Sequence, residues 1–128
     1  MWIYTTRGFF SIVGDKERPT EVLVRARLKG DLDNLREAWP TLTPTRETNR
    51  RDYRFRANLP ARELPLLLSK LASEVTYTNF KDAVGMLQGH ERADLYHDVW
   101  SVMANAQDAE FEKDAQESIA ALTKGAKY

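Results

Sequence analysis

Residues 20–29, with the sequence TEVLVRARLK, decide the fold. Their side chains alternate in character, and successive side chains of a β-strand point to opposite faces of the sheet. One face would carry the apolar side chains Val22, Val24, Ala26 and Leu28, and the other would carry Leu23, Arg25 and Arg27. The pattern predicts a strand that packs one face on a core and turns a cationic face away from it.

Residues 51–59, RDYRFRANL, repeat this alternation. Here Arg54, Arg56 and Asn58 alternate with the predicted core side chains Tyr53, Phe55, Ala57 and Leu59. If the two strands share a sheet, their arginines gather on one face, and we expect residues of the first strand to join them. The predicted anion-binding set is Arg7, Phe9, Arg25, Arg27, Arg54, Arg56 and Asn58.

The order of the predicted elements indicates an α+β fold. Residues 1–13 are rich in β-branched and aromatic residues and are predicted to form one strand, joined by a turn to residues 20–29. Asp31 is expected to cap a helix over residues 32–38, and a mobile linker over residues 40–50 precedes the strand at 51–59. A helix over residues 61–75 follows, with a buried stripe of Leu64, Leu67, Leu68, Leu71 and Val75.

The remainder is predicted to be mainly helical. A short strand at residues 76–77 precedes a helix over 78–87 that Thr78 caps, and a last helix begins near Glu91. We therefore expect a mainly antiparallel sheet of three to four strands with helices on one face, a variant of the ferredoxin-like plait with an added C-terminal helix. Residues 1–107 would form a single α+β domain, and residues 108–128 an acidic helical extension.

Charge is distributed unevenly, although the net charge is zero. Residues 1–59 contain 12 Lys and Arg against 8 Asp and Glu, and residues 60–128 contain 7 against 11. With no cysteine there is no disulfide framework, which is compatible with a reducing cytoplasm. The first 13 residues lack a basic leader and a continuous apolar run, so we expect neither a signal peptide nor a membrane span, and a cytoplasmic protein.

Four sequence blocks resemble a family of small uncharacterised proteins from bacteria and their phages: RGFFSIV at 7–13, VRAR at 24–27, TNFKDAV at 78–84 and YHDVW at 96–100. The resemblance covers most of residues 1–104. It implies a cytoplasmic protein in a phage or mobile-element setting and supplies no catalytic residue. The run Arg7-Gly8-Phe9 is also similar to the start of a strand motif in RNA recognition modules, although Phe10 and Ser11 depart from that motif.

Guanidinium groups bind phosphates bidentately and stack on bases, so the arginine face predicts a polyanion partner, with single-stranded nucleic acid as the principal hypothesis. A small anion or an acidic protein is an alternative. In another alternative the arginines are paired internally, by Glu91, Asp94 or Asp98 of the last helix or by the acidic tail. A different class of function is a protein-interaction module, either a homodimer or an inhibitor of a host protein, that uses the sheet face and the C-terminal helix.

His90, Asp94 and His97 have spacings of four and three residues, which place them on one side of a helix. Two imidazoles and a carboxylate could begin a zinc or iron site, and exposed helix residues explain the same pattern. The sequence has no nucleophile elbow, no phosphate-binding Gly-Lys loop and no dinucleotide fingerprint. We therefore expect a binding protein with no catalytic residue and no cofactor.

Overall fold

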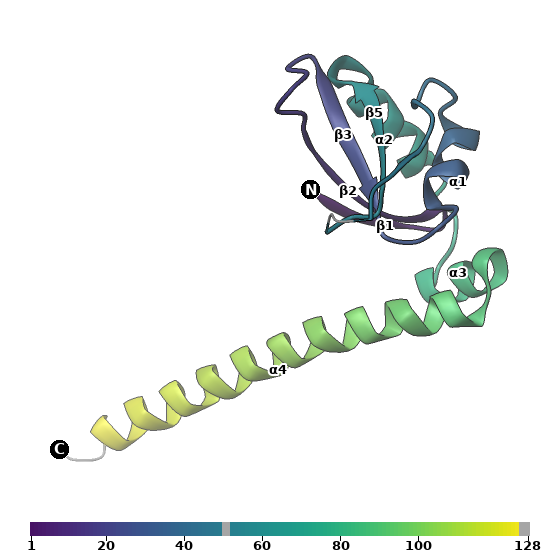
Figure 1. Ribbon diagram of the computed structural model, residues 1–128. Coiled ribbons are helices and arrows are strands. Elements are labelled where there is room, and N and C mark those ends of the chain that lie inside the picture. Colours follow the sequence, from purple (N-terminus) through teal and green to yellow (C-terminus); the bar gives the residue numbers. More distant parts are fainter. Residues whose placement is uncertain (50–51, 126–128) are drawn as a thin grey trace.

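The computed structural model describes residues 1–49 and 52–125. They form a five-stranded sheet and four α-helices, of which the last is the longest (Figure 1). The strands are β1 (Trp2–Thr5), β2 (Gly8–Gly14), β3 (Glu21–Ala26), β4 (Arg46–Glu47) and β5 (Phe55–Pro60). The helices are α1 (Asp31–Ala38), the short 3₁₀ turn η1 (Ala61–Glu63), α2 (Leu64–Ser73), α3 (Phe80–Gln88) and α4 (His90–Gly125).

The strand order is β1-β2-β3-β5-β4, and every neighbouring pair is antiparallel. The predicted α+β class and antiparallel sheet are thus confirmed, but the ferredoxin-like plait is not. That plait contains parallel strands joined by a helical crossover, whereas α1 follows β3 and leads to β4 and β5, and β5 pairs antiparallel with β3. The sheet has five strands, not three or four.

The first 13 residues contain two strands, not the single strand predicted. The chain reverses between Thr5 and Gly8, which are paired across the β1–β2 hairpin. Thr5 Oγ1 accepts hydrogen bonds from the backbone N–H of Arg7 at 3.1 Å and of Gly8 at 3.2 Å, and these stabilise the turn. The sequence prediction missed this hairpin because its two central residues, Thr6 and Arg7, are not typical turn residues.

The predicted bounds of several elements agree approximately with the observed bounds, whereas other predictions are wrong. Residues 76–77 are not a strand, and β4 lies in the predicted linker. Asn79, not Thr78, caps α3, because its Oδ1 accepts a hydrogen bond from the N–H of Asp82. Val75 and Leu28 are exposed because each lies beyond the end of its element. The predicted strand start at residue 51 and the last three residues of the predicted tail lie outside the described residues.

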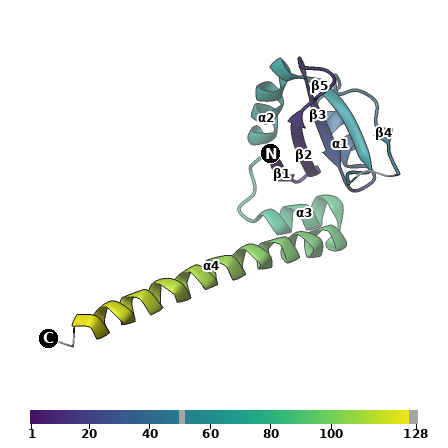
Figure 2. The ribbon, with the colours of Figure 1, turned by 60° about the vertical axis from the view of Figure 1, so that its left-hand side comes forward.

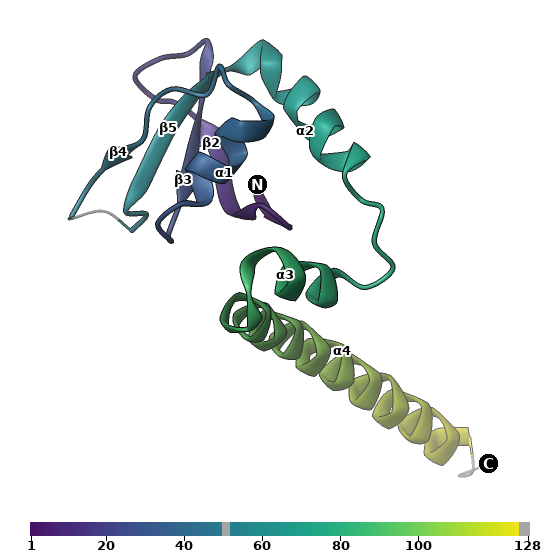
Figure 3. The ribbon, with the colours of Figure 1, turned by 90° about the vertical axis from the view of Figure 1, so that its right-hand side faces the viewer.

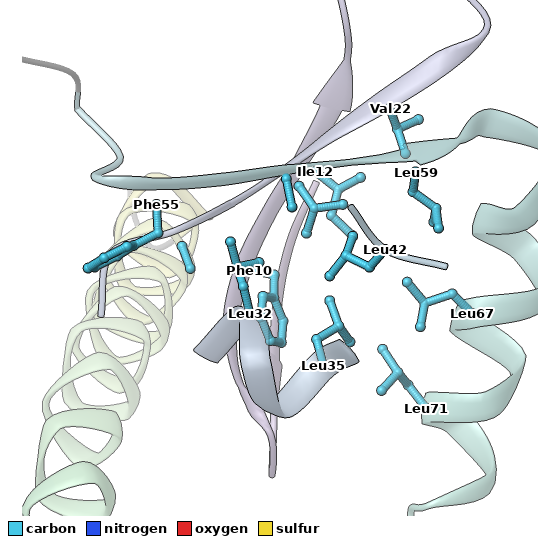
Figure 4. Close-up of a cluster of buried hydrophobic side chains, with 13 residues drawn as sticks. Phe10, Ile12, Val22, Leu32, Leu35, Leu42, Phe55, Leu59, Leu67 and Leu71 are labelled. Carbon is cyan, nitrogen blue, oxygen red and sulfur yellow. The ribbon is translucent and has the colours of Figure 1, made fainter. Parts of the chain in front are cut away.

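The hydrophobic core lies between one face of the sheet and the helices α1 and α2 (Figures 3 and 4). The predicted inward residues of β3 are buried, and so are those that lie within β5. Leu32 and Leu35 of α1 and Leu67 and Leu71 of α2 complete the core from the other side. The period-two pattern therefore identified the core face of both strands correctly.

The α3–α4 hairpin docks below this sandwich, and α4 then runs away from it (Figures 1 and 2). Phe80 of α3 stacks on Tyr96 of α4 with ring centroids 5.8 Å apart. Gln88 Nε2 donates to the carbonyl of Thr6. α4 is continuous across residue 108, where the acidic extension was expected to begin. Within the described part of the chain, no helix is both long and apolar enough to cross a membrane.

Candidate nucleic-acid interface

The sheet face that points away from α1 and α2, here called the open face, carries a row of arginines. The strand register aligns Ser11 of β2 with Arg25 of β3, Arg25 with Arg56 of β5, and Arg56 with Arg46 of β4. Directly paired residues project their side chains to the same face. Three neighbouring strands therefore each contribute one guanidinium group to a line across the sheet, as the alternation predicted for Arg25 and Arg56.

Tyr53 lies on the open face and not in the core as predicted. The Arg25 Cζ lies 4.4 Å from the centre of its ring, and the Arg27 Cζ lies 4.0 Å from it. Tyr53 precedes β5, so strand alternation does not set its direction, and its ring is buried under the two guanidinium groups. The negative face of an aromatic ring attracts cations, and this attraction helps to hold two like charges close together.

Three of the predicted arginines have carboxylate partners: Arg7, described below, Arg27 and Arg54. Arg27 Nη1 lies 3.0 Å from Asp52 Oδ1, and Arg54 Nε donates to Glu47 Oε1 at 2.8 Å. Contrary to the prediction, Arg54 is not on the open face, because its partner Glu47 is paired with the core residue Phe55 and its guanidinium lies over the Phe55 ring.

The sequence-based alternative placed such partners on the last helix, but those of Arg27 and Arg54 come from β4 and from the segment before β5. α4 meets the sheet near its start, where the Tyr96 ring lies 5.3 Å from that of Tyr4, and then leads away from it (Figure 2). The Arg27 and Arg54 ion pairs are largely exposed to solvent and contribute only about 0–1 kcal/mol each. On the open face, a phosphate group could therefore replace the carboxylate of Asp52.

Arg25 contacts a neutral group. Its Nη2 donates to Ser11 Oγ at 2.7 Å. Arg56 Nε donates to the Tyr53 carbonyl at 3.4 Å. Tyr53 thus contacts three arginines of the open face, two through its ring and one through its backbone.

Asn58 was expected to contact an anion, but its side chain is buried beneath other polar groups. Its Nδ2 donates to Asp15 Oδ2 at 2.7 Å, and its Oδ1 accepts from Arg46 Nη2 at 2.6 Å and from Arg18 Nη1 at 3.5 Å. The hydrogen bond from Asn58 holds the pKa of Asp15 below its ordinary value. Asn58 positions Arg46 on the open face and is not itself accessible to a ligand.

Arg7 was also expected on the open face, but it binds the opposite layer. Its Nε and Nη2 donate to the two carboxylate oxygens of Glu74 at 2.8 and 2.7 Å, and its Nη1 donates to the carbonyl of Asn34 in α1 at 2.8 Å. Arg7 occupies the β1–β2 turn, where strand alternation no longer determines direction. It ties the hairpin to α1 and to the residue after α2, and it does not belong to the candidate interface.

Phe9 lies at the aromatic end of the open face. Its ring stacks on Tyr4 at 4.4 Å between centroids and meets Trp2 edge-to-face at 6.2 Å. The Trp2 side chain is largely exposed. β1 and β2 therefore contribute an aromatic cluster, next to the arginines of β3, β5 and β4.

Sequence reasoning missed four residues of this face: Trp2, Tyr4, Arg46 and Tyr53. Trp2 and Tyr4 alternate with Ile3, and this would have placed them beside Phe9 if the β1–β2 turn had been recognised. β4 is only two residues long, so Arg46 had no alternation to indicate its direction.

The candidate metal residues His90, Asp94 and His97 do line one groove between α3 and α4. His97 Nδ1 lies 2.9 Å from Lys81 Nζ, and a cation at that position disfavours a bound metal ion. Among the described residues, no group of three or more His, Cys, Asp or Glu is arranged to hold a metal. The helical spacing was predicted correctly, but the geometry does not support a metal site there.

Comparisons with family models, curated proteins and solved structures found no match to this chain. Its function must therefore be inferred from the geometry of the open face.

Proposed function

We propose that this protein is a non-enzymatic binding module whose open face holds single-stranded nucleic acid. The observation that carries the proposal is the aligned row of Arg25, Arg56 and Arg46, with an aromatic cluster beside it on the same face. Cations for phosphates and aromatic rings for bases are the two components of sequence-independent single-strand binding.

The spacing between Arg25, Arg56 and Arg46 on their three strands suits a phosphate backbone. Neighbouring strands lie about 4.8 Å apart, so anchors on three strands spread over about 10 Å, which is roughly three nucleotides of a stacked strand at about 3.4 Å each. Guanidinium groups recognise phosphate oxygens in a bidentate manner. The exposed partner of Arg27 can be exchanged for phosphate at little cost.

The aromatic end of the face favours single strands over duplexes. Trp2 projects into solvent beside Phe9, so a base can stack on it. In a duplex the faces of the bases are covered by their stacked neighbours, and only their edges are exposed in the grooves.

Charge segregation within the chain is compatible with this proposal. Residues 90–125 contain 8 acidic and 3 basic residues, and the helix they form leads away from the sheet (Figure 1). Most of the acidic excess thus lies on a different element from the arginines of the open face. The zero net charge of the chain therefore does not argue against binding.

The test is the binding of a fluorescent single-stranded oligothymidylate at a series of salt concentrations. The double variant Arg25→Gln/Arg27→Gln should weaken binding and lower the slope of log affinity against log salt by about 1.4, since each phosphate contact contributes about 0.7. The matched control, Arg62→Gln/Lys70→Gln, removes two exposed charges from η1 and α2. Unchanged affinity in the first variant, or equal loss in both, would refute the proposal.

A second function, protein–protein interaction, is favoured by one observation. α4 exposes large apolar side chains, among them Trp100, Met103 and Phe111, on a helix that extends far beyond the body. Soluble monomers rarely present such a surface without a partner.

A further inference from the structure

One side of α4 begins as an intramolecular interface and continues without a partner among the residues that the structure describes. Near its start, Tyr96 stacks on Phe80 of α3, and the Trp100 ring lies 4.9 Å from Lys81 Nζ. Beyond Trp100 the same side presents Met103 and Phe111, and Phe111 is 75% exposed. In proteins most helical stability comes from the packing of an apolar face, so the unpacked outer half of this 36-residue helix favours a partner.

The exposed side contains an 11-residue repeat. Trp100, Phe111 and Leu122 are 11 residues apart, Ala104 and Ala115 follow the first two of them by four, and Gln107 and Ser118 follow by seven. Eleven residues make three helical turns of about 3.67 residues, so the repeat runs along the helix as a nearly straight stripe. Trp100 and Phe111 are therefore each followed, one turn later, by an alanine.

We propose that two copies of this chain pair through α4 in an antiparallel arrangement centred beside Gln107. In this register Phe111 of each copy packs on Ala104 of the other, and Trp100 packs on Ala115. A large side chain meets a small one in each of these layers, as close packing between helices requires. Such a two-fold contact is self-complementary.

The charge pattern supports a second copy in this orientation. Residues 99–107 contain no charged side chain, whereas residues 108–117 contain five acidic side chains and one lysine. A parallel pair would place the two acidic segments side by side. The antiparallel register places the acidic segment of each copy against the uncharged segment of the other, and like-charge repulsion is small.

The structure leaves space for the partner helix, and the expected buried area is within the range of specific interfaces. Past residue 117, the partner helix would continue along the groove between α3 and α4, which Gly85, Met86 and Ala93 help to line. Two aromatic side chains from each copy, with their apolar neighbours, would bury on the order of 1,000 Å², the lower end of specific interfaces. We therefore expect a reversible dimer.

Sedimentation velocity over a roughly hundredfold range of protein concentration tests the association. Phe111→Gln should weaken the dimer at least about tenfold. Because Phe111 is exposed in the single chain, this variant should fold normally. The control Val102→Gln changes an exposed apolar residue on the opposite side of α4 and should leave the dimer intact. A monomer at every concentration, or equal effects of both variants, would overturn the proposal.

Single cysteines report the register, because the chain has none of its own. Under mild oxidation Gln107→Cys should form a covalent dimer, whereas Ala115→Cys should not, since the two copies of residue 115 would be about 22 Å apart along the axis. Cross-linking of both variants, or of neither, would overturn the antiparallel register.

Added salt distinguishes the dimer from nucleic-acid binding. Salt should not dissociate the dimer, whereas it should weaken nucleic-acid binding, so the failure of one proposal is distinguishable from failure of the other.

Discussion

Arg92 of α4 forms a buried ion pair with Asp31 at the start of α1. Arg92 Nη1 lies 2.9 Å from Oδ1 and donates a hydrogen bond to Oδ2 at 3.0 Å. Oδ2 also accepts from the backbone N–H of Phe9 at 3.1 Å. The sequence predicted Asp31 as a helix cap, but Gly30 takes the cap position, and Asp31 instead joins β2, α1 and α4.

Replacing Arg92 should therefore destabilise the protein. Arg92→Met leaves the Asp31 carboxylate buried without its counter-charge, which costs about 3 kcal/mol or more of the free energy of unfolding at pH 7. Burial raises the pKa of Asp31, so this penalty grows as the pH rises through that raised pKa and shrinks in acid. Urea denaturation at two pH values measures both effects. A loss no larger than that of exposed Arg62→Met would contradict the role of the pair.

Gly8 should not tolerate a side chain. A Cβ at this position would lie 2.5 Å from Asp31 Cγ, and the residue has φ of +152°. Since Asp31 is held by the ion pair and cannot move aside, Gly8→Ala should cost about 2 kcal/mol or more. Gly14→Ala, in the same strand, is the control, because a Cβ there meets no described atom within 4 Å. Thermal denaturation of the two variants would give similar melting temperatures if this packing were unimportant.

The ion pair between Arg7 and Glu74 should make stability depend on pH. The hydrogen bonds from Arg7 hold the pKa of Glu74 below its ordinary value of 4.5. A lowered pKa means that the stabilisation is present above the unfolded value and is lost as the pH falls through the folded one. Glu74→Gln should therefore cost about 1–2 kcal/mol at pH 7 and little below the lowered pKa. An equal loss at both pH values would show that the carboxylate charge is not responsible.

Trp2 should contribute to affinity through stacking and not through charge. Trp2→Ala should weaken oligothymidylate binding by about 1–3 kcal/mol and leave the salt slope unchanged. The side chain is exposed, so the fold should be unaffected. Leu66→Ala, which removes an exposed apolar side chain from α2, is the control and should bind the oligonucleotide normally. Equal losses in the two variants would argue against an aromatic platform on β1.

The sequence predicted the fold best where regular alternation spans several residues. In β3 and β5 the period-two pattern identified the core face and placed Arg25 and Arg56 on the other face. It failed at residues outside regular strands. Arg7 lies in a turn and Tyr53 precedes its strand, so each took a direction set by a tertiary partner: Glu74 for Arg7, and two guanidinium groups for Tyr53.

The candidate site was predicted only in part, because the positions of several of its residues depend on tertiary contacts that sequence alternation does not show. Alternation can show that Arg25 faces away from the core, but it cannot show which residues of other strands lie beside it. That depends on register, which here aligns Ser11, Arg25, Arg56 and Arg46. Asn58 had the correct face, but its burial by Asp15, Arg18 and Arg46 depends on segments distant in sequence.

The most direct test of nucleic-acid binding is an NMR titration that follows the arginine Nε–Hε and tryptophan indole signals as an unlabelled single-stranded oligonucleotide is added at low salt. We predict that the signals of Arg25, Arg46, Arg56 and the Trp2 indole shift together and return when salt is raised, while those of Arg62 and Arg92 do not move. No shift at low salt, or shifts confined to α2, α3 or α4, would contradict the account.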